Sequence, residues 1–210
     1  MKRIVVRSIA FLLLLLLIAG GWYYYKMKSP PANTPGRLAA LNSDAGLLVK
    51  LSSRARQARQ FAALKKYNTT VCFLIDMSIP SGSNRIFVYN LVKDSLLDAG
   101  LVTEGSCSKG NRFGNEVGCG CTSLGKYKIG SAYQGKFGLA YKLHGLDQTN
   151  SNAFKRFVVL HSHDCVPASE VDPYPICRSE GCPTVAPYFL QKLAATIDGS
   201  SRPVLLWIFE

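Results

Sequence analysis

The stretch "GKYKIGSAYQGKFGLAYKLHG", residues 125–145, decides the fold class of this chain. Its two ends, residues 125–133 and 139–145, are rich in β-branched and aromatic residues, and the segment between them contains two glycines. Such a composition, interrupted by glycine, is typical of successive β-strands. The stretch therefore predicts two strands and indicates a domain that is mainly β.

Four other stretches have a similar composition and predict further strands. They are "TVCFLIDM" at 70–77, "RIFVYNLV" at 85–92, "RFVVLHSH" at 156–163 and "PVLLWIFE" at 203–210. Gly, Ser, Pro and Asn separate them, as expected for turns and loops. Together, the six stretches predict one β domain over residues 69–210.

Two segments have helical patterns instead. Within residues 37–68, apolar residues recur at three and four positions, namely Leu48, Leu51, Ala55, Ala58 and Ala62. This pattern predicts an amphipathic helix that lies on the domain. Residues 183–199, "PTVAPYFLQKLAATIDG", have apolar residues at helical spacing and end in Asp-Gly. They predict a second helix that begins just after Cys182.

Length and charge limit the classes of function. A chain of 210 residues with 48% hydrophobic content suits one domain with a core and a short appendage. The chain has 25 Lys and Arg against 13 Asp and Glu, a net charge of +12. This excess favours contact with anionic polymers or membrane surfaces, so binding to nucleic acid has to be weighed.

The N-terminal segment predicts export. Residues 8–25 contain no charged side chain, and a spanning helix needs roughly 17 to 25 apolar residues. Aromatic residues at 22–25 and the lysines that follow suit a membrane interface. We predict an uncleaved signal anchor over residues 1–28; a cleaved secretory signal is the alternative, because Ala19 and Gly21 suit a signal peptidase.

Export constrains the rest of the interpretation. Residues 29–36 contain three prolines and predict a short, stiff tether between the anchor and the domain. An exported domain lies outside the cytoplasm. That location opposes nucleic-acid binding, for which the chain has no recognised motif.

The chain contains seven cysteines, at positions 72, 107, 119, 121, 165, 177 and 182. An oxidising compartment favours disulfides, so we expect six to pair and one to remain free. Cys165 and Cys177 can close a short loop, and Cys107 can pair with either Cys119 or Cys121. The spacing of Cys119 and Cys121 is too close to indicate a zinc site, and no metal or cofactor is expected.

The motif "CRSEGCP", residues 177–183, contains the candidate nucleophile Cys182. A catalytic thiol needs a general base, a group that orients the base, and amide donors for the developing oxyanion. His161 ends a predicted strand and is the candidate base, and the carbonyl of Ser162 can hold its other ring nitrogen. The amides of Gly181 and Cys182 can form the oxyanion hole, and glycine permits close approach of substrate.

Two neighbours are expected to affect the Cys182 thiol in opposite directions. The dipole of a helix that starts just after Cys182 would lower the thiol pKa. The carboxylate of Glu180 would raise it. A purely structural interpretation is also open, in which Cys182 is a disulfide partner and His161 a buried residue at the end of a strand.

Residues 121–162, followed by "RSEGCPTV" at 178–185, resemble the murein L,D-transpeptidase catalytic domain family, the YkuD-like family, in its branch with an SxGCP motif. The similarity runs through 123–127, 133–138, 145–147 and Arg156 into His161, and it covers most of residues 70–210. The resemblance implies a β-sandwich catalytic domain with flanking helices. In this family, a cysteine attacks the carbonyl between the third residue of a peptidoglycan stem and the fourth, D-alanine.

The resemblance assigns the catalytic roles. It implies that Cys182 is the nucleophile, His161 the base and then the acid, and Ser162 the backbone group that orients His161. Gly181 and Cys182 supply the oxyanion amides.

The resemblance also suggests residues that contact the substrate or shape the site. Ser179 shapes the turn, Tyr133 lines the donor groove, and Arg178 and Arg156 are candidates for the carboxylates of the stem peptide. For Arg156, the alternative is that it only holds a loop. His163 and Asp164 receive no role. Glu180 departs from the widespread motif, which has histidine there.

We therefore expect a cysteine acyltransferase of the bacterial cell envelope that acts on peptidoglycan stem peptides. It is anchored in the inner membrane, with its catalytic domain on the outer side. An amine acceptor gives L,D-transpeptidation, which cross-links the third residues of two stems, and water gives L,D-carboxypeptidation. A non-catalytic, disulfide-rich module that binds the cell wall is the other alternative. The sequence specifies no oligomeric state.

Overall fold

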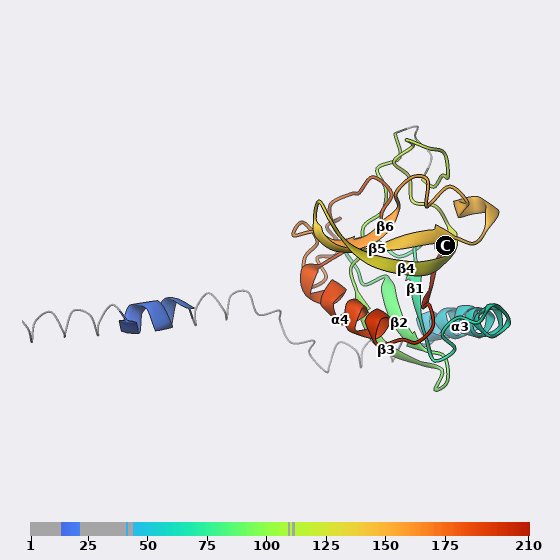
Figure 1. Ribbon diagram of the computed structural model, residues 1–210, viewed down its shortest axis with the longest axis horizontal. Helices are drawn as coiled ribbons and strands as arrows, with labels where there is room; N and C mark the ends of the chain where they lie inside the picture. Colours follow the sequence, from blue (N-terminus) through green and yellow to red (C-terminus); the bar gives the residue numbers. More distant parts are fainter. Residues whose placement is uncertain (1–13, 22–40, 42–43, 109, 111) are drawn as a thin grey trace, which may run out of the picture. The chain divides into compact units, whose positions relative to one another are not determined.

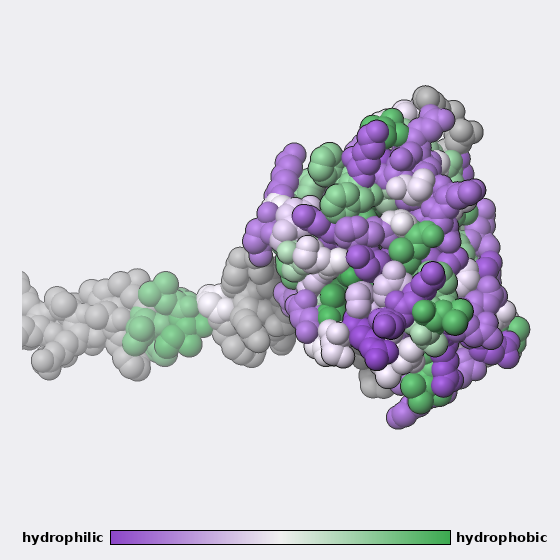
Figure 2. Space-filling model, turned by 45° about the vertical axis from the view of Figure 1, so that its right-hand side comes forward, coloured by the Kyte–Doolittle hydropathy of each residue, from purple (hydrophilic) through white to green (hydrophobic). Residues whose placement is uncertain are grey.

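The computed structural model describes residues 14–21, 41, 44–108, 110 and 112–210. The chain divides into two units, residues 1–32 and 33–210. In the first unit, residues 14–21 form a helical segment with exposed apolar side chains, green in Figure 2. The rest of the predicted anchor and the tether lie outside the described residues. Among the described residues, no helix is long and apolar enough to cross a membrane.

The second unit is built on one mixed sheet of eight strands in the order β3-β2-β1-β8-β4-β5-β6-β7 (Figure 1). The strands are β1 (Val71–Asp76), β2 (Ile86–Asn90), β3 (Ser95–Gly100), β4 (Gly125–Gly135), β5 (Gly138–Gly145), β6 (Val159–Ser162), β7 (Thr184–Val185) and β8 (Leu205–Phe209). The helices are α3 (Ala45–Lys65), α4 (Pro187–Asp198) and the short 3₁₀ helix η1 (Gln148–Asn150). The prediction of a mainly β domain with flanking helices is confirmed, and all six predicted stretches contain a strand.

The expected sandwich of two sheets differs from the structure, because the strands form one continuous sheet. The last strand, β8, pairs in parallel with β1 and antiparallel with β4. It thereby joins the β3-β2-β1 half to the half that contains β4 to β7. The sequence predicts six strand-like stretches, but it does not predict that the last of them lies between β1 and β4 in the sheet.

The two helices pack on opposite faces of the sheet. Along β1, Phe73 and Ile75 belong to the core that α4 covers, whereas Cys72 and Leu74 belong to the core under α3. This alternation follows from the period of two of a β-strand. On α3, the predicted apolar stripe is buried at Leu51, Ala55, Ala58 and Ala62, while Leu48 is half-buried.

The prediction that a helix begins just after Cys182 is wrong, because α4 begins at Pro187. Thr184 and Val185 form β7 instead, in parallel register with His161 and Ser162 of β6. The sequence favours this arrangement, since Thr and Val suit strands and proline suits the first turn of a helix. A helix dipole acts mainly within the first turn, so α4 does not lower the Cys182 pKa as expected.

Candidate active site

The pairing of β6 with β7 brings Cys182 and His161 to one cavity. His161 lies opposite Thr184 in the parallel register, and Cys182 lies two residues before Thr184. A cavity of about 280 Å³ is lined by both residues. Its other lining residues are Thr103, Phe137, His163, Cys165, Arg178, Ser179, Glu180 and Thr184. The fold therefore places the candidate nucleophile and the candidate base on the walls of the same cavity.

Both ring nitrogens of His161 have polar neighbours. Nδ1 lies 3.0 Å from the carbonyl oxygen of Ser162, and Nε2 lies 3.0 Å from the hydroxyl of Thr184. A carbonyl only accepts, so Nδ1 carries the proton and Nε2 accepts from Thr184. Phe137 stacks on the ring, with centroids 5.3 Å apart. The imidazole is thus held in one orientation and one tautomer, with its basic nitrogen at Nε2.

The electrostatics of His161 suit a base. The side chain is buried, and burial lowers its pKa, as does nearby His163, while the hydrogen bond to Ser162 opposes the shift. A histidine whose pKa lies below its ordinary value of about 6.5 is neutral at neutral pH. His161 can therefore accept a proton under those conditions.

Cys182 is a half-buried free thiol. Burial is the main cause that raises its pKa, and Glu180 raises it further, as expected. A hydrogen bond from the backbone of Val159 and the charge of Arg156 act in the opposite direction. Because the net shift is upward, the thiol is protonated at neutral pH and needs a base to become a nucleophile.

The expectation of a single free cysteine is wrong. The structure has two disulfides, Cys165–Cys177 as predicted and Cys107–Cys121, which is one of the two alternatives for Cys107. Cys72, Cys119 and Cys182 are free. Cys72 is buried in the core under α3, and burial raises the pKa of its thiol, so it stays protonated.

Gly181 occupies a position that requires glycine. Its φ is +101°, and a Cβ there would lie 2.5 Å from the carbonyl oxygen of Cys121 and 2.9 Å from Nη2 of Arg156. The turn is closed by Ser179, whose hydroxyl donates to the carbonyl of Cys182 at 2.7 Å and accepts from the amide of Gly181 at 3.2 Å. The Gly181 amide, predicted to face the oxyanion, is thus engaged by Ser179 in this structure.

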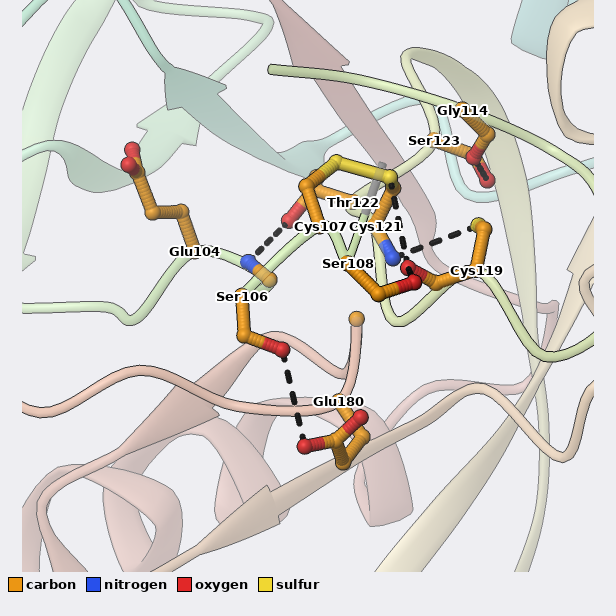
Figure 3. Close-up of a disulfide and its surroundings, with 12 residues drawn as sticks. Glu104, Ser106, Cys107, Ser108, Gly114, Cys119, Cys121, Thr122, Ser123 and Glu180 are labelled. Atoms are coloured by element: carbon orange, nitrogen blue, oxygen red, sulfur yellow. Dashed lines mark hydrogen bonds between the residues drawn. A yellow bond between two sulfur atoms is a disulfide. The ribbon is translucent and has the colours of Figure 1, made fainter. Parts of the chain in front are cut away.

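A disulfide-bonded loop lies against the cysteine motif (Figure 3). The amide of Ser106 donates to the carbonyl of Ser179 at 2.8 Å, and the amide of Ser179 donates to the carbonyl of Glu104 at 2.9 Å. The next residue along this loop, Cys107, is bonded to Cys121. Figure 3 shows the Glu180 carboxylate directed at Ser106, whose hydroxyl lies 3.5 Å away. Glu180 therefore lies between the cavity and this loop.

The structure separates the two candidate arginines. Arg156 donates to the carbonyls of Gly114 and Cys121 at 3.1 and 2.6 Å and to the hydroxyl of Ser123 at 2.5 Å. It is not among the described residues that line the cavity, so these contacts favour the role of holding a loop. Arg178 does line the cavity and is 63% exposed. It remains available to a ligand.

Two cavity residues, Thr184 and Phe137, have no recognised signal in the sequence. Thr184 follows the cysteine motif by two positions, and only the β6–β7 register places its hydroxyl at His161. Phe137 lies between β4 and β5. Conversely, Tyr133 on β4 is partly exposed and is not among the described residues that line the cavity.

The described residues also contain no group of three or more His, Cys, Asp or Glu side chains arranged to hold a metal ion. The reactive side chains that line the cavity are the thiol of Cys182 and the imidazole of His161.

Comparisons with known proteins found one family model and several solved structures. The family model of the L,D-transpeptidase catalytic domain matches residues 47–207. No curated protein matches the chain significantly. Among solved structures, the helical cell shape determining protein Pgp2 from Campylobacter jejuni is 11% identical, with a TM-score of 0.42, over 67% of this chain and 48% of that chain. An L,D-transpeptidase from Xylanimonas cellulosilytica is 14% identical, with a TM-score of 0.39, over 71% of this chain and 68% of that chain.

The chain spans about half the length of the Campylobacter protein. The family assignment depends instead on the family model, which covers most of the chain and includes both β6 and the cysteine motif. On this ground, the chain belongs to the L,D-transpeptidase catalytic domain family.

Proposed function

We propose that the protein is a cysteine-dependent L,D-transpeptidase that acts on peptidoglycan stem peptides. The observation that carries this proposal is the shared cavity of a free thiol, Cys182, and a buried imidazole, His161, whose basic nitrogen faces Thr184. The raised pKa of Cys182 and the lowered pKa of His161 keep the thiol and the imidazole neutral at rest, so His161 would act as a general base while the thiol attacks.

In the first half-reaction, the Thr184 hydroxyl turns from Nε2 of His161 to the carbonyl of Cys182, which lies 3.4 Å from it, and frees the lone pair of Nε2. Nε2 then takes the proton of Cys182, and Sγ attacks the carbonyl between the third and fourth residues of the stem. The amide of Cys182 donates to the oxyanion, and the Gly181 amide joins it if it releases Ser179. The tetrahedral intermediate collapses with cleavage of the C–N bond. His161 returns the proton to the leaving D-alanine, and a thioester remains.

In the second half-reaction, an acceptor amine attacks the thioester, and His161 takes its proton. The C–S bond breaks, and the thiol recovers its proton. An amine from another stem gives a cross-link, and water in its place gives a carboxypeptidase. The alternative of a wall-binding module without catalysis requires Cys182 to be a structural cysteine, and its free thiol favours the enzyme.

We further propose that residues 1–28 anchor the domain in the inner membrane, with residues 33–210 on the outer side. The uncharged stretch at 8–25 and the two disulfides of the domain support this placement. Resistance of the full chain to extraction from membranes at alkaline pH, together with an intact N-terminal mass, is the expected result. Release of a shortened chain would indicate a cleaved signal.

Incubation of the full chain with a disaccharide tetrapeptide, followed by intact-mass and product analysis, tests the enzymatic proposal. We expect D-alanine release and a thioester adduct that disappear in Cys182→Ala and persist in Cys119→Ala, which removes another free thiol. Dimers indicate transfer, and tripeptides indicate hydrolysis. A folded wild-type chain that forms no adduct and releases no D-alanine would refute the proposal.

A further inference from the structure

A second cavity, of about 320 Å³, shares Arg178 with the catalytic cavity. Three arginines line it, Arg85, Arg112 and Arg178, together with the carboxylate of Glu104. Glu104, Arg112 and Arg178 also line a further cavity on the disulfide-bonded loop. The catalytic mechanism proposed above uses neither Arg85 nor Arg112.

Arg85 is almost completely buried, with 1% of its side chain exposed. Its Nε donates to the carbonyl of Val102 at 2.9 Å, and Nη1 lies 3.2 Å from both the carbonyl of Ile79 and the carboxylate of Glu104. Its buried Nη2 has no hydrogen-bond partner in the described part of the chain. This nitrogen is itself buried, so Arg85 contributes a fixed positive charge to the cavity wall, and the donors for a ligand come from the more exposed arginines.

The other two guanidinium groups are more exposed. Arg112 is 47% exposed and Arg178 is 63% exposed, and each lies 4.0 Å from the Glu104 carboxylate, beyond hydrogen-bonding distance. Arg112 also contacts Glu210 and the carbonyl of Met77. Two carboxylates, Glu104 and Glu210, are thus paired with three guanidinium groups, which leaves one excess positive charge at the cavity wall.

We propose that this cavity binds a carboxylate of the peptide donor and so positions the peptide for attack by Cys182. Guanidinium groups match a carboxylate in geometry and charge. Arg178 borders both cavities, so a peptide in the catalytic cavity can extend past it toward Arg112. The inference rests on the proposed function and specifies the part of the substrate that is recognised.

The ligand carboxylate is either the C-terminal carboxylate of the donor or a carboxylate within the stem. Both have the same chemistry, and selective amidation distinguishes them. The experiment measures the affinity of the full-length Cys182→Ala chain for a tetrapeptide, by calorimetry, so that turnover does not interfere. The same measurement uses the peptide amidated at one carboxylate or the other.

We expect amidation of the recognised carboxylate to weaken binding by about ten- to hundredfold, since a hydrogen bond to a charged group is lost. Arg112→Gln and Arg178→Gln should each weaken binding of the acid peptide to a similar extent. The amidated peptide should lose little further affinity in these variants. Arg59→Gln makes the same change of charge on the exposed face of α3 and should leave the affinity unchanged.

Equal affinity for the acid and amide peptides, or equal losses in Arg59→Gln and Arg112→Gln, would overturn the carboxylate site. If the wild-type chain nevertheless releases D-alanine, the proposed function stands and only the site is lost. If the chain neither binds the peptide nor turns it over, both proposals fail. Circular dichroism of each variant excludes unfolding as the cause of a loss.

Discussion

The hydroxyl oxygen of Thr184 lies 3.0 Å from Nε2 of His161, the ring nitrogen opposite the one that Ser162 holds. The parallel register of β6 and β7 fixes this pair, because it sets the two residues directly opposite each other. The base is therefore oriented from both sides before any substrate binds. Thr184 is a positioning residue for the reaction proposed here.

We expect Thr184→Val, which keeps the shape but removes the hydroxyl, to lower kcat for D-alanine release by about tenfold, as expected for one lost hydrogen bond. KM should change little, because the hydroxyl acts on His161 rather than on the peptide. Steady-state kinetics separate the two constants, and Thr184→Ser should restore most of kcat. An unchanged kcat in Thr184→Val would show that Ser162 alone orients the ring.

The pH dependence should reflect the lowered pKa of His161. Burial disfavours the imidazolium, so His161 stays neutral below its ordinary pKa of about 6.5 and becomes protonated only at lower pH. The kcat/KM for D-alanine release should therefore be constant near neutral pH and fall at a pH below about 6.5. An acidic limb centred above that pH would contradict the assignment of His161 as the base.

Glu180 should suppress the reactivity of Cys182. Its carboxylate is one cause of the raised Cys182 pKa, so Glu180→Gln should lower that pKa and increase the thiolate fraction below it. We expect faster alkylation of Cys182 by iodoacetamide, a neutral reagent, as followed by peptide mass analysis. Because Glu180 is exposed, the difference from wild type should shrink at high salt. A slower reaction in Glu180→Gln would contradict this role.

The sequence predicts those parts of the fold that depend on local composition. The six strand stretches and the buried face of α3 have strong periodic patterns, and the structure contains them. β7 has only two residues, and β3, "SLLDAG", includes Asp and Gly, so neither resembles a strand in isolation. The continuous sheet also depends on pairing between β1 and β8, which lie far apart in the chain.

In the candidate site, too, the local contacts can be predicted from the sequence and the long-range contacts cannot. The motif residues that lie close together in sequence, such as Ser179, Gly181 and Cys182, are also close in the structure. The contacts of Thr184 with His161 and of Arg156 with the loop depend on strand register and on loop folding. The composition of a segment determines neither the register of two strands nor the path of a loop, so these contacts cannot be predicted from the sequence alone.

Arg156 should act through the loop that it holds. Arg156→Lys keeps the charge but cannot reproduce the fork that contacts Gly114, Cys121 and Ser123. We expect it to lower the free energy of unfolding by about 2 kcal/mol, the scale of a lost network of hydrogen bonds. Urea denaturation measures this change. A variant as stable as wild type, with weaker peptide binding in the Cys182→Ala background, would instead indicate contact with the substrate carboxylate.

The Cys107–Cys121 disulfide should influence catalysis as well as stability. It joins two cysteines with a sequence separation of 14. A disulfide that closes a loop of this size raises the free energy of unfolding by about 3 kcal/mol, because it constrains the unfolded chain. One end of the disulfide adjoins Ser106, which bonds to Ser179, and the carbonyl at the other end lies against Gly181. The two ends of the disulfide therefore lie against two different residues, Ser179 and Gly181, of the turn that presents Cys182.

We expect Cys107→Ala to lower the unfolding free energy by about 3 kcal/mol and also to lower kcat at temperatures where the chain remains folded. Cys119→Ala is the matched control, because it removes a sulfur from the same loop and leaves the disulfide intact. Its kcat should stay near that of wild type. If Cys107→Ala loses stability while kcat is retained, the loop stabilises the fold without positioning Cys182, and Arg156 and Ser179 are then sufficient to hold the turn.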